Sequence, residues 1–379
     1  MRILLVGEYS GFHNSLKHGL QALGHEVTLL AGGDGFKNYP VDVFVGSDFF
    51  DRGTWRKRIQ MGIFKITGVD LRDSLLWFRF RESVTRQKNY DIIQFINSNP
   101  FNCQPATEWK FINSLLENKG TAYLVACGDD FEYSRYLVHE HEGYSILDAV
   151  NSSGGNKNVL LGTFKYLRQG YKTNYQKLVK RVEKVIPSNT DYAMALQHQP
   201  KANPIIKAPA VLDKFELTQN TDLNIIEIFL GINNSNFWKK GINFFLDALE
   251  IVKEKYGDRV KITIARDLPY QEYIRLYDNC HILLDQVLCY DQGYNALEAM
   301  LKGKVVFAGG GEEYLKYHNL KKVPVVDAIP DVADLVSKLS YLIEHPNRIL
   351  ELGKQARQHV IEHHDSIKIA QQFVEVYQL

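Results

Sequence analysis

The sequence predicts an α/β protein with two Rossmann-like domains, each built on a doubly wound parallel sheet. Short apolar runs alternate with helically spaced segments through the first half of the chain. The same alternation begins again near residue 224. The chain has 379 residues, which is more than one ordinary hydrophobic core usually holds. Two similar domains in succession account for all three observations.

The first half of the chain supplies six expected strands in order. The opening run RILLVG, residues 2–7, is followed by residues 13–23, whose apolar positions recur at helical spacing before Gly24. The later apolar runs are short and bounded by turn residues, as expected for buried strands. They are residues 26–30, 41–46, 91–96, 121–126 and 182–189, with a helix at 105–118 between the fourth and fifth strands.

The second half repeats this pattern after a polar, proline-containing stretch at 200–223. Its expected strands are 224–231, 260–265, 281–286 and 304–309, and its expected helices are 241–256, 270–278, 292–302, 330–345 and 347–375. We therefore expect an N-terminal domain over 1–205 and a C-terminal domain over 206–360. A last helix over 361–379 is expected to pack back on the N-terminal domain.

The composition limits the classes of function. A formal net charge of +1 argues against general nucleic-acid binding, which needs a strongly basic surface. The four cysteines lack metal-type spacing and are expected to be reduced thiols. The chain opens directly on a strand, and no apolar run is long enough to cross a bilayer. We expect a cytoplasmic protein, with peripheral contact to the inner face of the membrane at most.

The most informative stretch is DQVLCYDQGYNALEAM, residues 285–300. Here an apolar strand leads through a glycine into a helix. The N–H groups of Gly293, Tyr294 and Asn295 are expected to face phosphate at that helix start. The carboxylate of Glu298, one turn further on, is suited to sugar hydroxyls. The alternative is an ordinary turn whose glutamate only complements the helix dipole.

Three longer stretches carry a family resemblance, which the N-terminal RILLVGEYSGFHNSLKHGLQALGHEV extends. They are GYNALEAMLKGKVVFAGGGEE at 293–313, FLGINNSNFWKKGINFFLDAL at 229–249, and the segment 345–377. Together they resemble nucleotide-sugar glycosyltransferases of the GT-B fold, in the retaining group called glycosyltransferase family four. The resemblance implies that the donor binds the C-terminal domain and the acceptor binds the N-terminal domain. The reaction would take place in the cleft between them, without a metal ion.

The resemblance also assigns residues on the donor side. Glu298 matches the second glutamate of the family's E-x7-E motif, which contacts ribose hydroxyls. The first glutamate of that motif falls on Tyr290, and the neighbouring Asp291 is the candidate substitute. Lys240 matches a lysine that precedes a glycine and reaches the diphosphate, and Lys239 stands beside it.

On the acceptor side, the first strand-to-helix loop offers Ser10, Gly11 and His13 to the donor phosphate or the acceptor. The alternative for His13 is a residue at a helix start that has no functional role. Asp130, with Asp129 beside it, matches a polar residue that faces the reacting sugar in the family. The alternative for Asp130 is an Asx turn after the strand.

These assignments predict a retaining hexosyltransferase that acts in polysaccharide, lipopolysaccharide or glycolipid assembly. Its catalytic residues would be Asp130, His13 and Lys240, and it would need a nucleotide-diphosphate sugar but no cofactor. The acceptor would be a saccharide or a lipid-linked sugar, and the basic stretches 54–65 and 164–181 would contact lipid headgroups.

Two alternatives remain open. One is a nucleotide-sugar epimerase of the same fold. The other is a non-catalytic nucleotide-sugar-binding subunit. The second is favoured by Tyr290 and by residues 232–234, Ile-Asn-Asn, which stand where the family has an arginine.

Overall fold

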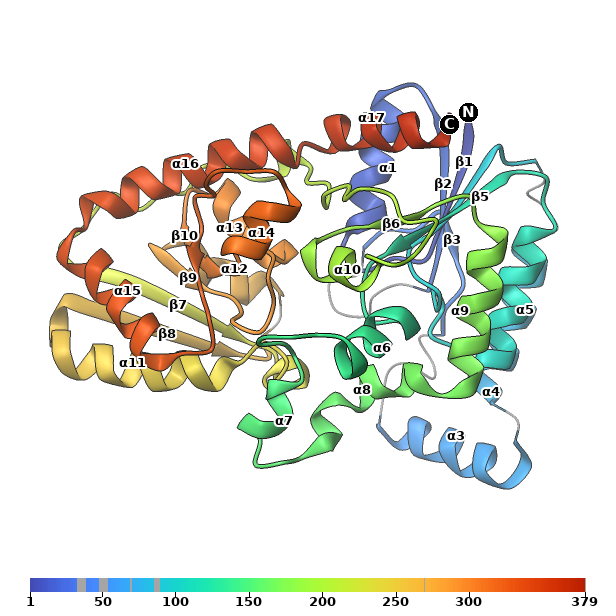
Figure 1. Cartoon of the computed structure of the whole chain (residues 1–379), viewed down its shortest axis with the longest axis horizontal. Helices are drawn as coiled ribbons and strands as arrows, with labels where there is room; N and C mark the ends of the chain where they lie inside the picture. Colours follow the sequence, from blue (N-terminus) through green and yellow to red (C-terminus); the bar gives the residue numbers. More distant parts are fainter. Residues whose placement is uncertain (33–38, 48–53, 69, 85–88, 269, 379) are drawn as a thin grey trace.

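The computed structural model of the chain has two α/β lobes lying side by side (Figure 1). It describes every residue except 33–38, 48–53, 69, 85–88, 269 and 379. The N-terminal lobe holds a six-stranded parallel sheet in the order β3-β2-β1-β4-β5-β6. Its strands are β1 (Arg2–Val6), β2 (Glu26–Ala31), β3 (Val43–Phe44), β4 (Ile92–Phe95), β5 (Thr121–Ala126) and β6 (Val185–Pro187).

The C-terminal lobe holds a five-stranded parallel sheet in the order β11-β10-β9-β7-β8. Its strands are β7 (Ile226–Ile232), β8 (Val260–Arg266), β9 (Ile282–Leu284), β10 (Val305–Ala308) and β11 (Val326–Asp327). In both sheets the strand order reverses beside the first strand, which is where α/β folds bind ligands. The predicted fold of two Rossmann-like parallel sheets is confirmed.

Helices cover the sheets of both lobes. In the N-terminal lobe they are α1 (Phe12–Ala22), α3 (Thr54–Thr67), α4 (Leu71–Val84), α5 (Pro105–Leu116), α6 (Phe131–His139), α7 (Asp148–Ser152), α8 (Leu161–Phe164), α9 (Gln169–Arg181) and α10 (Thr190–Ala195). After the linker they are α11 (Ile242–Tyr256), α12 (Tyr270–Asp278), α13 (Tyr294–Leu301), α14 (Glu312–Tyr317), α15 (Val332–Glu344), α16 (Asn347–His363) and α17 (Ser366–Tyr377).

The prediction of one helix over 347–375 is wrong, because the chain breaks between α16 and α17. The carboxylate of Asp365 accepts a hydrogen bond from the N–H of Ile367 and caps α17. At the break, the N–H of Ala210 donates to the carbonyl of His364 at 2.6 Å, and the N–H of Ser366 donates to the carbonyl of Ala210 at 2.9 Å. The two segments that cross between the lobes therefore bind each other.

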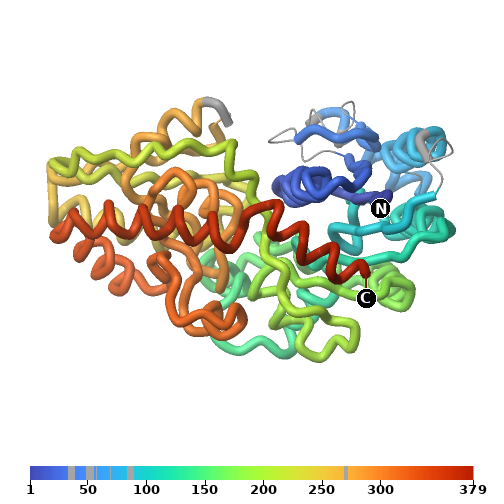
Figure 2. The backbone as a smooth tube through the Cα atoms, turned by 90° about the horizontal axis from the view of Figure 1, so that it is seen from above, coloured from blue at the N-terminus to red at the C-terminus, as the bar shows by residue number. Residues whose placement is uncertain are grey.

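Helix α17 lies on the N-terminal lobe, as Figure 2 shows by the path of the C-terminal segment. It packs against α1, where Gly19 allows a close approach: a Cβ at this position would lie 2.0 Å from the carbonyl oxygen of Ser366. Further along, Phe373 is fully buried and meets Phe12 edge to face, with ring centroids 6.2 Å apart. The last helix thus completes the hydrophobic core of the first lobe.

A second apolar cluster is shared by the lobes on the side of α6 and α7. Tyr133, Leu137 and Ile146 of the N-terminal lobe belong to the same buried cluster as Phe245 and Leu288 of the C-terminal lobe. Burial of apolar surface from both lobes in one cluster favours their contact. This cluster and the docking of α17 both hold the lobes together.

We predict that Phe373→Ala lowers the free energy of unfolding by about 3–5 kcal/mol, because it leaves a cavity between α17 and α1. Urea unfolding followed by circular dichroism measures this loss. Ile367→Ala, at an exposed position of the same helix, is the matched control and is expected to change stability by about 0.5 kcal/mol or less. Equal effects of the two substitutions would contradict the packing role of α17.

Candidate functional site

A buried carboxylate at the end of β9 joins two predicted donor-side residues. The ammonium of Lys240 lies 2.6 Å from Oδ1 of Asp285, and the amide nitrogen of Asn295 donates to the same oxygen at 3.1 Å. The hydroxyl of Tyr273 donates to the side-chain oxygen Oδ1 of Asn295 at 2.8 Å. Oδ2 of Asp285 has no hydrogen-bond partner among the described residues. The structure therefore brings Lys240 and Asn295 together around an acid from the strand end.

The first turn of α13 follows directly. Gly293 is its N-cap residue, and no described side chain caps this helix start. Unpaired N–H groups at a helix N-terminus attract anions. Glu298 lies one turn further along in the buried part of the same helix. The side chain of Tyr294 turns to the inter-lobe linker, where its hydroxyl donates to the carbonyl of Pro209 at 3.0 Å.

Lys239 binds across the lobes. Its ammonium lies 2.7 Å from Oδ2 of Asp129, which also accepts a hydrogen bond from the hydroxyl of Thr163 at 2.5 Å. The sequence pointed to Asp129 only as the neighbour of Asp130, and nothing in the sequence indicated Thr163. A carboxylate at the end of one sheet and a lysine of another lobe become neighbours only through the tertiary structure.

The structure does not support a catalytic Asp130, because this side chain turns into its own helix. It is the N-cap of α6, and its carboxylate accepts a hydrogen bond from the N–H of Tyr133 at 2.9 Å. Burial, with smaller contributions from neighbouring carboxylates, raises the pKa of Asp130 to about 7. Asp130 therefore has the local capping role that the Asx-turn alternative predicted. Asp129 is the acid that binds the other lobe, through Lys239.

The ring of His13 is fully buried in the N-terminal lobe, which argues against the predicted catalytic role. Nδ1 lies 2.7 Å from the carbonyl of Gly7, so this nitrogen carries the proton and donates it. Nε2 accepts from the amide nitrogen of Gln94 at 3.1 Å, and Oε1 of Gln94 accepts from the hydroxyl of Tyr377 at 2.6 Å. Burial lowers the pKa of His13 to about 3. Through Gln94 on β4, the His13 ring of α1 is therefore connected to Tyr377 of α17.

The first strand-to-helix loop is occupied by an acidic side chain of its own. Oε1 of Glu8 accepts from the N–H of Gly11 at 2.9 Å, and Oε2 accepts from the backbone N–H and the side-chain amide of Asn14. A carboxylate therefore already takes the place predicted for a donor phosphate. Ser10 is exposed, with its carbonyl bound by the hydroxyl of Tyr39. Glu8 therefore engages the N–H of Gly11 that was predicted for the donor, while a donor contact by the hydroxyl of Ser10 stays a prediction.

The predicted substitution of Asp291 for the missing glutamate also conflicts with the geometry. Its carboxylate is buried and accepts hydrogen bonds from Thr190, His318 and Gln292. Burial by itself would raise the pKa of Asp291, but the hydrogen bond and charge of His318 bring it below its ordinary value. Tyr290 points to the N-terminal lobe, where its hydroxyl donates to the carbonyl of Tyr144.

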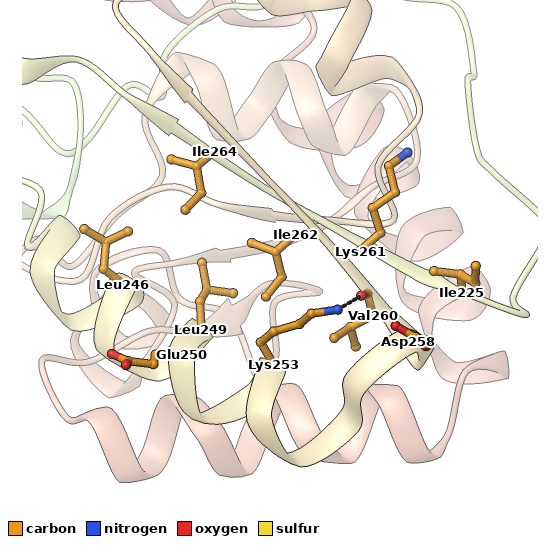
Figure 3. A pocket seen from close by; sticks show the side chains of 10 residues that line it. All are labelled: Ile225, Leu246, Leu249, Glu250, Lys253, Asp258, Val260, Lys261, Ile262 and Ile264. Carbon is orange, nitrogen blue, oxygen red and sulfur yellow. Dashed lines mark hydrogen bonds between the residues drawn. The ribbon is translucent and has the colours of Figure 1, made fainter.

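A hollow of about 720 Å³ lies elsewhere in the C-terminal lobe, between α11 and the edge strand β8 (Figure 3). Its lining includes Leu246, Ile262 and Ile264, and the ammonium of Lys253 donates to the carbonyl of Val260 at its floor. None of the predicted site residues lines it. The hollow is therefore separate from the residues gathered around Asp285.

The two basic stretches differ in their surroundings. In 164–181, Lys165 lies over the rings of Tyr166 and Tyr171, and Lys177 lies over Trp109. The stretch 54–65 belongs to α3, which carries exposed apolar side chains. Within the described residues, no group of three or more His, Cys, Asp or Glu is arranged to hold a metal ion. No helix in the described part of the chain is long and apolar enough to cross a membrane.

Comparison with known proteins supports the fold. Residues 239–375 match the family described as "Glycosyl transferase-like". Sucrose-phosphate synthase from Thermosynechococcus elongatus has 14% identity and a TM-score of 0.59, over 100% of this chain and 98% of that chain. Anabaena HepE in complex with UDP and glucose has 14% identity and a TM-score of 0.56, over 100% and 99% of the two chains.

UDP-GlcNAc 2-epimerase from Neisseria meningitidis, bound to UDP-GlcNAc, is similar over 99% of each chain, with 12% identity and a TM-score of 0.50. No curated protein sequence matches this chain significantly. The resemblance to GT-B glycosyltransferases is confirmed: the chain has the GT-B fold, and its C-terminal part carries a glycosyl transferase-like domain.

We predict that the free energy of unfolding of Asp130→Asn, relative to that of the original protein, increases as the pH rises. The folded-state pKa of about 7 lies above the ordinary value of 3.8, so the folded state retains a proton that the unfolded chain loses in this window. The acid therefore costs stability as the pH rises from about 4 to 7, by up to about 1.4 kcal/mol per pH unit. Asparagine caps helices equally well but carries no charge.

Melting temperatures of the two proteins at pH 5, 6, 7 and 8 measure this difference. The matched control is Asp331→Asn at the exposed N-cap of α15. A difference for Asp130→Asn that stays constant with pH would contradict the argument.

Proposed function

We propose that the protein is a retaining glycosyltransferase of the family four type, which transfers a hexose from a nucleoside-diphosphate sugar to a hydroxyl acceptor. One observation carries the proposal: Lys240 and Asn295 meet around Asp285 at the uncapped start of α13. This arrangement lies within the segment that matches the glycosyl transferase-like family. HepE binds UDP and glucose, which makes UDP-sugars the first donors to test.

The proposed role of Lys240 is to stabilise the leaving diphosphate. Its side chain is partly exposed, while that of Asp285 is fully buried. The lysine is therefore held by a buried carboxylate and remains partly accessible to a ligand. Charge develops on the diphosphate as the sugar leaves, so a fixed cation and the N–H groups of Gly293 to Asn295 lower the barrier. Glu298 is the proposed ligand of the ribose.

The proposed reaction uses no side chain as a general base. His13 and Asp130 are both engaged within the N-terminal lobe, so neither is retained in a catalytic role. In the retaining mechanism proposed here, the acceptor hydroxyl approaches on the face that the diphosphate leaves. A departing phosphate oxygen then takes the proton of the acceptor. The acceptor hydroxyl is proposed to belong to a saccharide or a lipid-linked sugar in polysaccharide, lipopolysaccharide or glycolipid assembly.

A non-catalytic nucleotide-sugar-binding subunit is the second candidate. It is favoured by the positions of Tyr290 and Asp291, which both bind the N-terminal lobe and leave this loop without a free carboxylate for the transferred sugar. Product analysis with and without acceptors separates the possibilities. A transferase releases nucleotide only with an acceptor, an epimerase converts the donor alone, and a binding subunit does neither.

We also propose that α3 rests on an anionic lipid surface on the inner face of the membrane. The helix lies at the outer edge of the N-terminal lobe (Figure 1). Trp55, Ile59 and Ile66 recur at helical spacing, and their exposed fractions are 59%, 51% and 87%. Arg58 and Lys65 lie on the same helix. Apolar side chains with flanking cations are typical of helices that lie in the membrane interface.

We predict that Lys240→Met slows sugar transfer at least tenfold and weakens UDP binding, because one positive charge near the diphosphate is lost. Isothermal titration with UDP and a UDP-release assay measure the two effects. Lys302→Met is the matched control, because Lys302 also pairs with a carboxylate, Asp278 at 2.5 Å, in the same lobe. The control is expected to lose stability without losing UDP affinity. Unchanged UDP binding in Lys240→Met would refute the donor site.

We predict that the double substitution Trp55→Ala and Ile66→Ala reduces sedimentation with phosphatidylglycerol-containing vesicles at least fivefold, because the exposed apolar contacts are removed. Vesicles of phosphatidylcholine alone should bind weakly in every case. Ile264→Ala, at an exposed apolar position on the edge strand of the other lobe, is the control and should bind like the original protein. Vesicle binding that survives the double substitution would exclude α3 as the contact.

A further inference from the structure

The loop 289–292, which leads into α13, is enclosed on two sides. On one side it packs directly on backbone: a Cβ at Gly309 would lie 2.4 Å from the carbonyl oxygen of Cys289. The side-chain amide of Gln292 also donates to the carbonyl of Gly309 at 2.5 Å. On the other side the loop meets the N-terminal lobe at α10. Its conformation is therefore determined jointly by both lobes.

Asp291 makes the main contact with α10. Its Oδ2 accepts from the backbone N–H of Thr190 at 2.8 Å and from the hydroxyl of Thr190 at 2.9 Å. Nε2 of His318 lies 3.1 Å from the same oxygen, and Oδ1 accepts from the N–H of Gln292 at 2.7 Å. Thr190 is the first residue of α10, so a C-terminal-lobe carboxylate satisfies the first N–H group of an N-terminal-lobe helix.

Tyr290 makes a second set of contacts with the same lobe. Its ring stacks on that of Tyr144, with centroids 4.6 Å apart and an interplanar angle of 25°. Its hydroxyl donates to the carbonyl of Tyr144 at 2.9 Å. Its backbone N–H lies 3.2 Å from the carboxylate of Asp191, the residue after Thr190. Two neighbouring residues of the loop thus bind two separate segments of the N-terminal lobe.

We propose that Tyr290 and Asp291 form an inter-lobe lock that positions the first turn of α13 for the donor. The lock comprises Asp291 with Thr190 and His318, and Tyr290 with Tyr144. Only Gln292 separates Asp291 from Gly293, the N-cap of α13, so a shift of the loop moves the N–H groups that are proposed to bind phosphate. Tyr290 and Asp291 are positioning residues in this scheme, because they act through α13. The proposal rests on the proposed function.

The lock assigns position 290 a different role from the one the resemblance implies. A residue that contacted the transferred sugar would have its side chain free on the donor side. The side chain of Tyr290 instead hydrogen-bonds to Tyr144, and that of Asp291 hydrogen-bonds to Thr190 and His318. The two roles make opposite predictions for Tyr290→Glu, which restores the carboxylate of the family motif.

The test measures the affinity of UDP and of UDP-glucose by calorimetry for Asp291→Asn, Thr190→Val, their combination and Tyr290→Glu. The lock predicts an approximately tenfold weaker affinity of both ligands for Asp291→Asn and for Tyr290→Glu. Thr190→Val should weaken both ligands as well, although Thr190 lies in the other lobe. The combination should weaken the affinity by less than the sum of the two separate effects, because both substitutions act on the same contact.

Unchanged UDP affinity in Asp291→Asn and Thr190→Val, or a stronger affinity for UDP-glucose in Tyr290→Glu, would overturn the lock. Asp331→Asn, an exposed helix cap of the same lobe, is the matched control and should leave both affinities unchanged.

Hydrogen exchange separates a failed lock from a failed function, because it needs no ligand. In Asp291→Asn, one carboxylate oxygen becomes an NH2 group, so the N–H groups of Thr190 and Gln292 cannot both keep their acceptors. Because the two segments share this side chain, 190–195 and 289–293 should exchange faster together. Faster exchange in both segments, without UDP binding by the original protein, would refute the proposed function but retain the lock. Unchanged exchange in segment 190–195 would refute the lock, whatever binds. Thr190→Val keeps the backbone N–H donor and covers the case in which Asp291→Asn fails to fold.

Discussion

Buried and half-buried carboxylates where the two lobes meet are matched by donors or cations, and these matches join the lobes at specific residues. An ionised acid loses its hydration on burial and stays charged only when hydrogen bonds or opposite charges replace the water. Asp129 is matched by Lys239 from the other lobe, and Asp291 by Thr190 and the C-terminal lobe's His318. In both cases the acid and at least one of its partners come from different lobes. Separating the lobes would remove Lys239 from Asp129 and Thr190 from Asp291, and would leave each acid with fewer partners.

Asp191 illustrates the cost of this arrangement. Burial, together with the nearby charge of Asp291, raises the pKa of Asp191 to about 7. The interface thus carries one firmly ionised acid beside one that retains its proton to near neutral pH. The apolar cluster shared by α6 and the C-terminal lobe and the docking of α17 on α1 supply the burial that makes such pairing necessary.

The same principle shapes the proposed donor side. Lys240 is held by Asp285, and Lys239 is held by Asp129, so neither lysine is a free cation. A diphosphate bound near α13 would share Lys240 with Asp285, while the helix start contributes N–H groups that no described side chain caps. The N-terminal loop differs, because Glu8 already occupies the start of α1. The two lobes therefore offer unequal sites to an anion, and the C-terminal lobe is the favourable one.

Much of the fold could be predicted from the pattern of the sequence. The strands around Leu4, Ile93, Phe229 and Val306 were expected because short apolar runs between turn residues have few other stable arrangements. The break at Asp365 was missed, because apolar periodicity continues across it and only the cap and the bridge to Ala210 reveal the turn. Among the site residues, Lys240 and Asn295 both bind Asp285, because the segments that carry them are neighbours in one lobe. His13 and Asp130 carry suitable groups, but they point into the interior of the other.

The sequence by itself determined the two parallel sheets, their order along the chain and the glycine-led helix start at 293–295, because these depend on local periodicity and on residues close together in the chain. Only the tertiary structure decided which carboxylate pairs with which donor. The direction of a side chain depends on partners far away in sequence: Thr190 lies 101 residues from Asp291, and Asp129 lies 110 residues from Lys239. Burial then makes those distant partners obligatory, since an acid withdrawn from water must find its hydrogen bonds within the protein.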